Sequence, residues 1–127
     1  MLKVIKTENA PGAIGTYSQG IRAGGLVFTS GQLGIDPATG ELERGDFAEQ
    51  ARLVLQNLKG ILEAGGSSLK HVVKLTVFLA DLADFPVLNE VFAECFEDDP
   101  PARSTVQVAA LPLGADVEIE ALGIVAE

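Results

Sequence analysis

The sequence is poor in the side chains on which many enzymes depend. Its 127 residues include one cysteine, one histidine, one tyrosine and no tryptophan. A single cysteine allows no disulfide within the chain, so we expect a reducing compartment, the cytoplasm. One histidine and one cysteine supply too few ligands for a transition-metal site. A Ser-His-Asp triad would have to use His71, and the sequence contains no G-x-S-x-G elbow to supply the serine.

Basic residues are scarce as well. Nine Lys and Arg stand against 18 Asp and Glu, which gives a formal net charge of −9. A protein that binds nucleic acid needs a clustered basic surface, so no nucleic-acid partner is expected. No apolar run reaches the length of a membrane span, and no membrane partner is expected. The opening residues have no apolar core of the kind that a signal peptide requires.

What is present is ordinary for a soluble globular protein. Hydrophobic residues make up 47% of the chain and charged residues 21%. The length suits one domain, 1–127, with one core. Cys95 lies at helical spacing from Val91 and Phe92 and is expected to be a small core side chain, not a nucleophile. His71 is expected at a solvated edge of a strand.

Hydrophobic periodicity and turn residues predict an α+β sheet of order βββαβαββ, with both helices on one face. A helix over 46–66 has Asp46 as its N-cap, and a second over 84–96 has Asp84 as a candidate N-cap and Pro86 in its first turn. The strands fall at 2–7, in a hairpin within 17–32 that turns at 23–25, in a central strand at 71–80, and at 102–111 and 115–126. Two helices cover only one face, so we expect self-association to bury the other.

Charged side chains interrupt the last two strands. A period of two places Arg103, Thr105 and Gln107 on one face of a strand that otherwise reads as buried. In the final strand, Glu118 and Glu120 share a face. These carboxylates either lie solvated at a sheet edge, or one pairs with Arg103, or they form a pocket with it. In such a pocket the Arg fork would bind a substrate carboxylate and a desolvated Glu would take a proton from water.

Two further segments offer weaker candidates. Tyr17, in GTYSQG, is either a half-buried aromatic or a pocket wall with a hydrogen-bond donor. Ser30 and Gly31 stand at a strand end, where a glycine lets backbone approach a ligand closely. No phosphate-binding glycine motif is present.

Four segments, in order, resemble the reactive intermediate deaminase (Rid, or YjgF-like) family, and most closely its RidA-type deaminases. They span nearly the whole chain: APGAIGTYSQG, FTSGQLGIDPATGEL, VVKLTVFLADLADFPVLNEVF and PPARSTVQVAALPLGADVEIEALG. The resemblance implies a chorismate-mutase-like fold and a homotrimer with sites between subunits. It also implies hydrolysis of 2-aminoacrylate or 2-aminocrotonate, as imines, to 2-keto acids and ammonia. No cofactor is implied. The enamines come from pyridoxal-phosphate enzymes, so the role would be metabolite damage control.

The resemblance also assigns residues. Arg103 falls at the position of the substrate-carboxylate arginine, and Glu118 at that of the glutamate that orients water. Tyr17, Ser30 and Gly31 match further pocket positions, with Glu120 in support. Thr105 stands where these deaminases carry cysteine, and we expect the strand backbone to bind substrate there. The loop before Arg103 also looks shorter than in those deaminases, which would either widen the mouth of the cleft or change the preferred substrate side chain.

Three alternatives remain. The first is a non-catalytic trimeric binder of small 2-keto or carboxylic acids, which would need Arg103 but not Glu118. The second is a ribonuclease, which the charge and the single histidine disfavour. The third is a structural or chaperone-like trimer.

Overall fold

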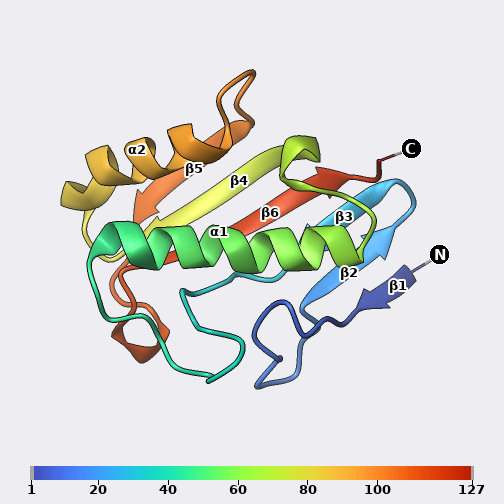
Figure 1. Cartoon of the computed structure of the whole chain (residues 1–127), viewed down its shortest axis with the longest axis horizontal. Coiled ribbons are helices and arrows are strands. Elements are labelled where there is room, and N and C mark those ends of the chain that lie inside the picture. Colours follow the sequence, from blue (N-terminus) through green and yellow to red (C-terminus); the bar gives the residue numbers. More distant parts are fainter. Residues whose placement is uncertain (1, 127) are drawn as a thin grey trace.

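One six-stranded sheet forms the body of the computed structural model, which describes residues 2–126 (Figure 1). The order βββαβαββ predicted from the sequence is confirmed. The elements are β1 (Leu2–Ile5), β2 (Gly20–Ala23), β3 (Leu26–Thr29), α1 (Phe47–Ala64), β4 (Val72–Leu79), α2 (Phe85–Cys95), β5 (Ala102–Gln107) and β6 (Val117–Ile124).

The strands lie in the order β1-β2-β3-β6-β4-β5. The last strand in sequence therefore sits in the middle of the sheet, antiparallel to both β3 and β4. β4 and β5 are parallel and are joined through α2. β5 is an edge strand with mostly exposed residues, so the expectation that it would be buried is wrong for the single chain. The strand at 71–80, in contrast, is central, as predicted.

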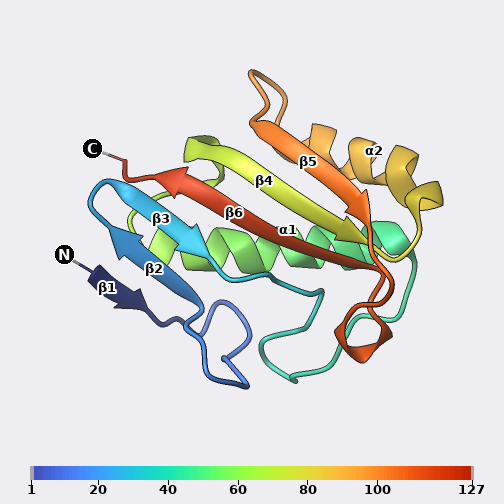
Figure 2. The same cartoon turned by 180° about the vertical axis from the view of Figure 1, so that it is seen from behind.

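Both helices cover the same face of the sheet, as expected (Figures 1 and 2). The core between the layers consists of fully buried aliphatic side chains, among them Val54, Leu58 and Ile61 of α1, and Leu75, Val77 and Ile119 of the sheet. α1 begins as predicted, because the side chain of Asp46 accepts a hydrogen bond from Glu49 N at 2.9 Å.

α2 begins differently from the expectation. The backbone of Asp84 is already helical, and its side chain makes no capping hydrogen bond. The chain enters α2 through a single 3-10 turn over Leu82–Asp84, and Asp81 caps that turn by accepting from Ala83 N at 2.9 Å. Because an N-cap residue needs an extended backbone, the preceding turn moves the cap from Asp84 to Asp81. Pro86 lies in the first turn of α2, as predicted.

The other face of the sheet carries no helix (Figure 2). Strand register places a row of large apolar side chains on it, and several are well exposed: Leu2, Val4, Leu26, Phe28, Val106 and Ile124. Such an apolar surface is unusual for a monomer in water. Within residues 2–126, no helix is long and apolar enough to cross a membrane.

Candidate functional site

Three loops, 6–19, 30–46 and 108–116, gather along one side of the sheet (Figures 1 and 2). They enclose a cavity of about 710 Å³ that is lined by Tyr17, Ser30, Gly31 and Glu118 together with apolar loop residues. Four of the residues predicted for the site therefore lie together. They come from distant parts of the sequence: Ser30 and Gly31 directly follow β3, and Glu118 is the second residue of β6.

Gln19 holds the first loop in place. Its side chain is 5% exposed, accepts from Thr7 N at 2.7 Å and donates to the carbonyls of Thr7, Ala10 and Pro11 at 2.7–3.2 Å. Ser30 follows β3, and its Oγ donates to the carbonyl of Ser18 at 2.5 Å. Because that bond uses the hydroxyl proton of Ser30, the lone pairs of Oγ are what remains to accept from a ligand N–H.

Glu118 places a carboxyl group in this cavity. It alternates with the buried Val117 and Ile119, so its side chain points to the face without helices. Burial, and after it the nearby charge of Glu120, raise the pKa of Glu118 above its ordinary value. Gly31 lies against this carboxyl group: a Cβ at Gly31 would overlap Glu118 Oε2 and lie 2.9 Å from its Cδ. Only a glycine leaves room for the carboxylate in this position.

Glu118 and Glu120 are not at a sheet edge, because β6 lies between β3 and β4. Among residues 2–126 of a single copy, neither carboxylate forms an ion pair with Arg103, so the readings as edge residues and as an ion pair are both wrong for one chain. Glu120 is exposed on the same face as Glu118, opposite Thr76 of β4.

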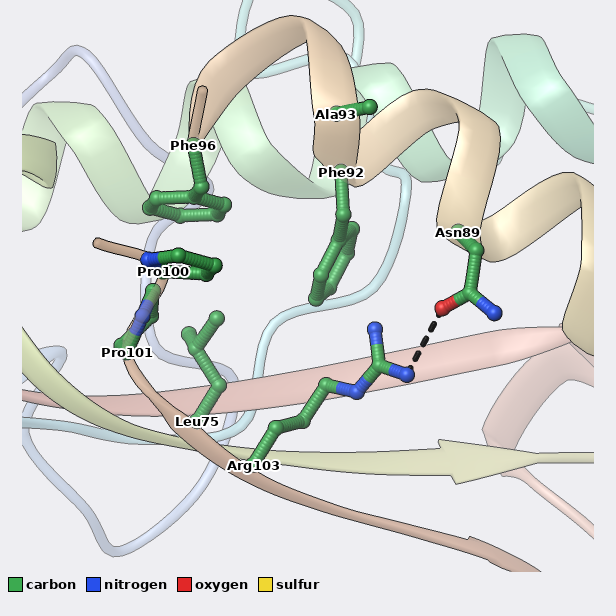
Figure 3. A pocket seen from close by; sticks show the side chains of 8 residues that line it. All are labelled: Leu75, Asn89, Phe92, Ala93, Phe96, Pro100, Pro101 and Arg103. Carbon is green, nitrogen blue, oxygen red and sulfur yellow. Dashed lines mark hydrogen bonds between the residues drawn. The ribbon is translucent and has the colours of Figure 1, made fainter. Parts of the chain in front are cut away.

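Arg103 lies in a second cavity, of about 440 Å³, between β5 and α2 (Figure 3). Its Nη2 donates to Asn89 Oδ1 at 2.7 Å, and its Cζ lies 5.3 and 5.1 Å from the ring centroids of Phe85 and Phe92. Burial lowers the pKa of Arg103, yet a guanidinium stays charged at neutral pH. Within residues 2–126 it has no ion-pair partner. The arrangement suits an incoming anion, since a fixed fork of N–H donors matches a carboxylate.

The structure does not bring Arg103 and Glu118 together within one chain. Arg103 is paired across the ladder with Leu75, which is buried under the helices, whereas Glu118 is paired with Phe78. Since side chains alternate along a strand, Arg103 and Glu118 point to opposite faces of the sheet. A substrate as small as an amino-acid derivative cannot contact both in a single copy.

Thr105 shares the face of Arg103. Its Oγ1 is buried and has no hydrogen-bond partner among the described residues. The side chain therefore does not enter the cavity of Glu118. Because β5 is an edge strand, part of its backbone N–H and C=O groups point away from the sheet and remain open to a ligand or a neighbouring chain.

Cys95 is exposed, so the expectation of a core position is wrong. Helical spacing does place it on the stripe of Leu88 and Val91, but Cys95 is the last residue of α2, and at this end of the helix Phe96 packs against the core. Burial and then Glu94 raise the pKa of its thiol, which disfavours the reactive thiolate. His71 is half-buried, with Nδ1 2.7 Å from Ser68 Oγ. Within residues 2–126, no group of three or more His, Cys, Asp or Glu side chains is placed to hold a metal ion.

The partners of Arg103 were missed in the sequence. Phe85, Asn89 and Phe92 follow one another at helical spacing and so share one face of α2, a signal that was available. That this face lies over Arg103 depends on how α2 packs on β5, which periodicity does not show.

Comparison with known proteins identifies the family. Residues 7–125 match the model of the family described as Endoribonuclease L-PSP. Reactive Intermediate Deaminase A, chloroplastic, of Arabidopsis thaliana is 51% identical over 120 residues, which cover 94% of this chain and 64% of that protein. The chain therefore belongs to the endoribonuclease L-PSP, or YjgF, family, and the resemblance to reactive intermediate deaminases is confirmed.

Solved structures agree with this assignment. The crystal structure of RidA from the Antarctic bacterium Psychrobacter is 53% identical, with a TM-score of 0.93 over 97% of this chain and 99% of that one. Escherichia coli TdcF, solved with bound serine, is 47% identical, with a TM-score of 0.93 over 98% of this chain and 99% of its own. The mixed α+β fold is thus that of the Rid structures, and one of these relatives binds a small amino acid.

Proposed function

We propose that this protein is an enamine/imine deaminase that hydrolyses 2-aminoacrylate and 2-aminocrotonate, through their imine tautomers, to 2-keto acids and ammonia. The observation that carries the proposal is the pair of complementary half-sites. One holds Arg103, which has no ion-pair partner among residues 2–126, and the other holds Glu118, whose pKa is raised. The name of the Arabidopsis relative and the serine bound to TdcF support a small amino-acid-like carboxylate as ligand.

The chemistry assigned to each residue follows from its position. Arg103, held by Asn89 and flanked by two rings, binds the substrate carboxylate. Glu118 accepts a proton from the water that attacks C2 of the imine. The carbinolamine then collapses and releases ammonia, as R–C(=NH)–COO⁻ and water become R–CO–COO⁻ and NH₃. Ser30 accepts from the substrate nitrogen, Tyr17 closes the pocket, and Glu120 and the Thr105 backbone assist.

A complete site requires two copies of the chain, and we propose a homotrimer. Arg103 and Glu118 point to opposite faces of one sheet. The helix-free face presents exposed apolar side chains, including Val4, Phe28 and Val106, that association would bury. In a ring of three, the Arg103 cavity of one copy meets the Glu118 cavity of the next.

Subunit complementation tests this directly. Arg103→Ala and Glu118→Ala are each expected to be inactive with a pyridoxal-phosphate dehydratase that releases the enamine from serine or threonine. Trimers formed from an equal mixture of the two should regain about a quarter of wild-type activity, because one site in four pairs the intact halves. No recovery in mixed trimers of confirmed mass would contradict the shared site.

A second candidate is a non-catalytic binder of small 2-keto or carboxylic acids, since the Arg103 cavity needs no Glu118 to hold a carboxylate. Binding of 2-ketobutyrate by wild type without faster keto-acid release would favour it. Ribonuclease activity, which the family description suggests, fits poorly with a net charge of −9 and one histidine. The pyridoxal-phosphate link and the role in metabolite damage control rest on the deaminase proposal.

A further inference from the structure

Large apolar side chains are exposed around the Glu118 cavity. Ile14 is 86% exposed and Leu113 is 54% exposed, and both line this cavity, although they come from loops a hundred residues apart. A single exposed leucine on a protein surface needs no explanation. Two apolar side chains that converge on one cavity beside a titratable carboxylate indicate a surface for an apolar group.

The backbone at Leu113 points to the same conclusion. Leu113 has φ 61° and ψ 15°, Gly114 has φ 69°, and Ala115 N donates to the carbonyl of Pro112 at 3.1 Å across the turn. Glycine, asparagine or aspartate is favoured where a turn needs positive φ, and leucine is disfavoured there. Core packing does not account for a leucine that is more than half exposed. Strained residues of this kind gather at functional sites.

The size of the cavity also matters. Its volume of about 710 Å³ lies within the range of pockets that hold ligands much larger than a three-carbon imino acid. Arg44 Nη2 donates to the carbonyl of Leu113 at 3.2 Å, so the turn is tied to the loop that precedes α1. The leucine is thus presented on a fixed turn.

We propose that Leu113 and Ile14 determine specificity by binding the substrate side chain, so that 2-imino acids with branched apolar side chains are preferred to the smallest ones. This inference rests on the proposed deaminase function. The reaction is unchanged: water adds at C2, and ammonia leaves with the formation of the keto acid. The two residues contact the part of the substrate that does not react, and so they set which imine is hydrolysed fastest.

The test compares the imines of leucine and alanine. An amino-acid oxidase forms each imine in the assay mixture, and semicarbazide traps the imine that the protein has not hydrolysed. Leu113→Gly and Leu113→Asn both suit the left-handed backbone and remove the apolar surface. We expect each to lower the ratio of kcat/KM for the leucine imine over the alanine imine by about tenfold. The alanine value should stay within about twofold, because the reacting groups are untouched. Leu82→Asn, at a leucine 46% exposed in a different turn, is the matched control and should leave the ratio unchanged.

Melting temperature and mass in solution separate this role from a structural one. Leu113→Gly relieves the positive φ, so its melting temperature should be equal or higher. An unchanged ratio in both variants overturns the inference while the deaminase stands. A loss of trimer mass together with an equal fall for both imines also overturns it, since Leu113 would then serve subunit contact. Wild-type protein that hydrolyses neither imine overturns the proposed function and this inference with it.

Discussion

Gly31→Ala tests the position of the Glu118 carboxylate with one added methyl group. The new Cβ would overlap Oε2 and lie 2.9 Å from Cδ, whereas carbon atoms in contact are usually 3.5–4.0 Å apart. The carboxyl carbon must therefore move by roughly 0.6–1.1 Å. A displacement of about 1 Å in a reacting group can cost about a hundredfold in rate. We expect kcat for keto-acid release to fall by about 10- to 100-fold.

Stability should change little, because the obstructing atoms are the end of a side chain that is half-buried and can rotate. The added methyl also lowers the entropy of the unfolded chain, so the free energy of unfolding should stay within about 1 kcal/mol of wild type. The assay is absorbance of the keto acid released with a serine or threonine dehydratase, alongside urea unfolding. Gly25→Ala is the matched control, since its Cβ would meet nothing within 4 Å.

Two results would refute the reasoning. Full activity of Gly31→Ala would show that the observed carboxylate position is not the working one. The same loss in the Glu118→Asp background would do so too, because the shorter side chain withdraws from the methyl group and the cost should shrink.

Three other perturbations have defined outcomes. Asn89→Ala removes the hydrogen bond that orients Arg103, so KM should rise several-fold with kcat nearly constant in steady-state kinetics; an unchanged KM would count against the carboxylate anchor. In the proposed reaction Glu118 is the base, so kcat/KM should fall with decreasing pH through a pKa above that of an ordinary glutamate, and Glu120→Gln should move this fall to lower pH; a profile flat down to the usual glutamate range would contradict it. Asn57→Ala removes the donor from two half-buried loop carbonyls, so urea unfolding should show a loss of about 2–3 kcal/mol; a loss under 1 kcal/mol would mean that water replaces the amide.

Patterns of a few consecutive residues predicted correctly those features of the fold that depend only on neighbouring residues. The cap at Asp46 and the alternation of Glu118 with its buried neighbours depend on a few consecutive residues, and both are as predicted. The prediction of Asp84 as an N-cap was wrong because the 3-10 turn before α2 already gives Asp84 a helical backbone. The prediction for Cys95 was wrong because periodicity gives the face of a helix but not which residue at its end packs against the core, which here is Phe96.

In the candidate site, too, the sequence predicted what neighbouring residues determine and missed what contacts between distant segments determine. A period of two groups residues within one strand, but it does not say which face of β5 matches which face of β6. That match is set by the register of both strands against β4, which is a non-local property. The sequence thus predicted Arg103 and Glu118 as a pair of interest, while their placement on opposite faces and the contact of Arg103 with Asn89 emerged from the structure.

The central position of the last strand has a consequence for synthesis of the protein. β6 joins the β1–β3 part of the sheet to the β4–β5 part, and it is the last of these six strands along the chain. A nascent chain that lacks residues 117–124 has two sheet fragments with open edges, which are prone to pair with other chains. A premature stop or proteolytic trimming that reaches β6 should therefore leave an aggregation-prone fragment instead of a folded but less stable protein.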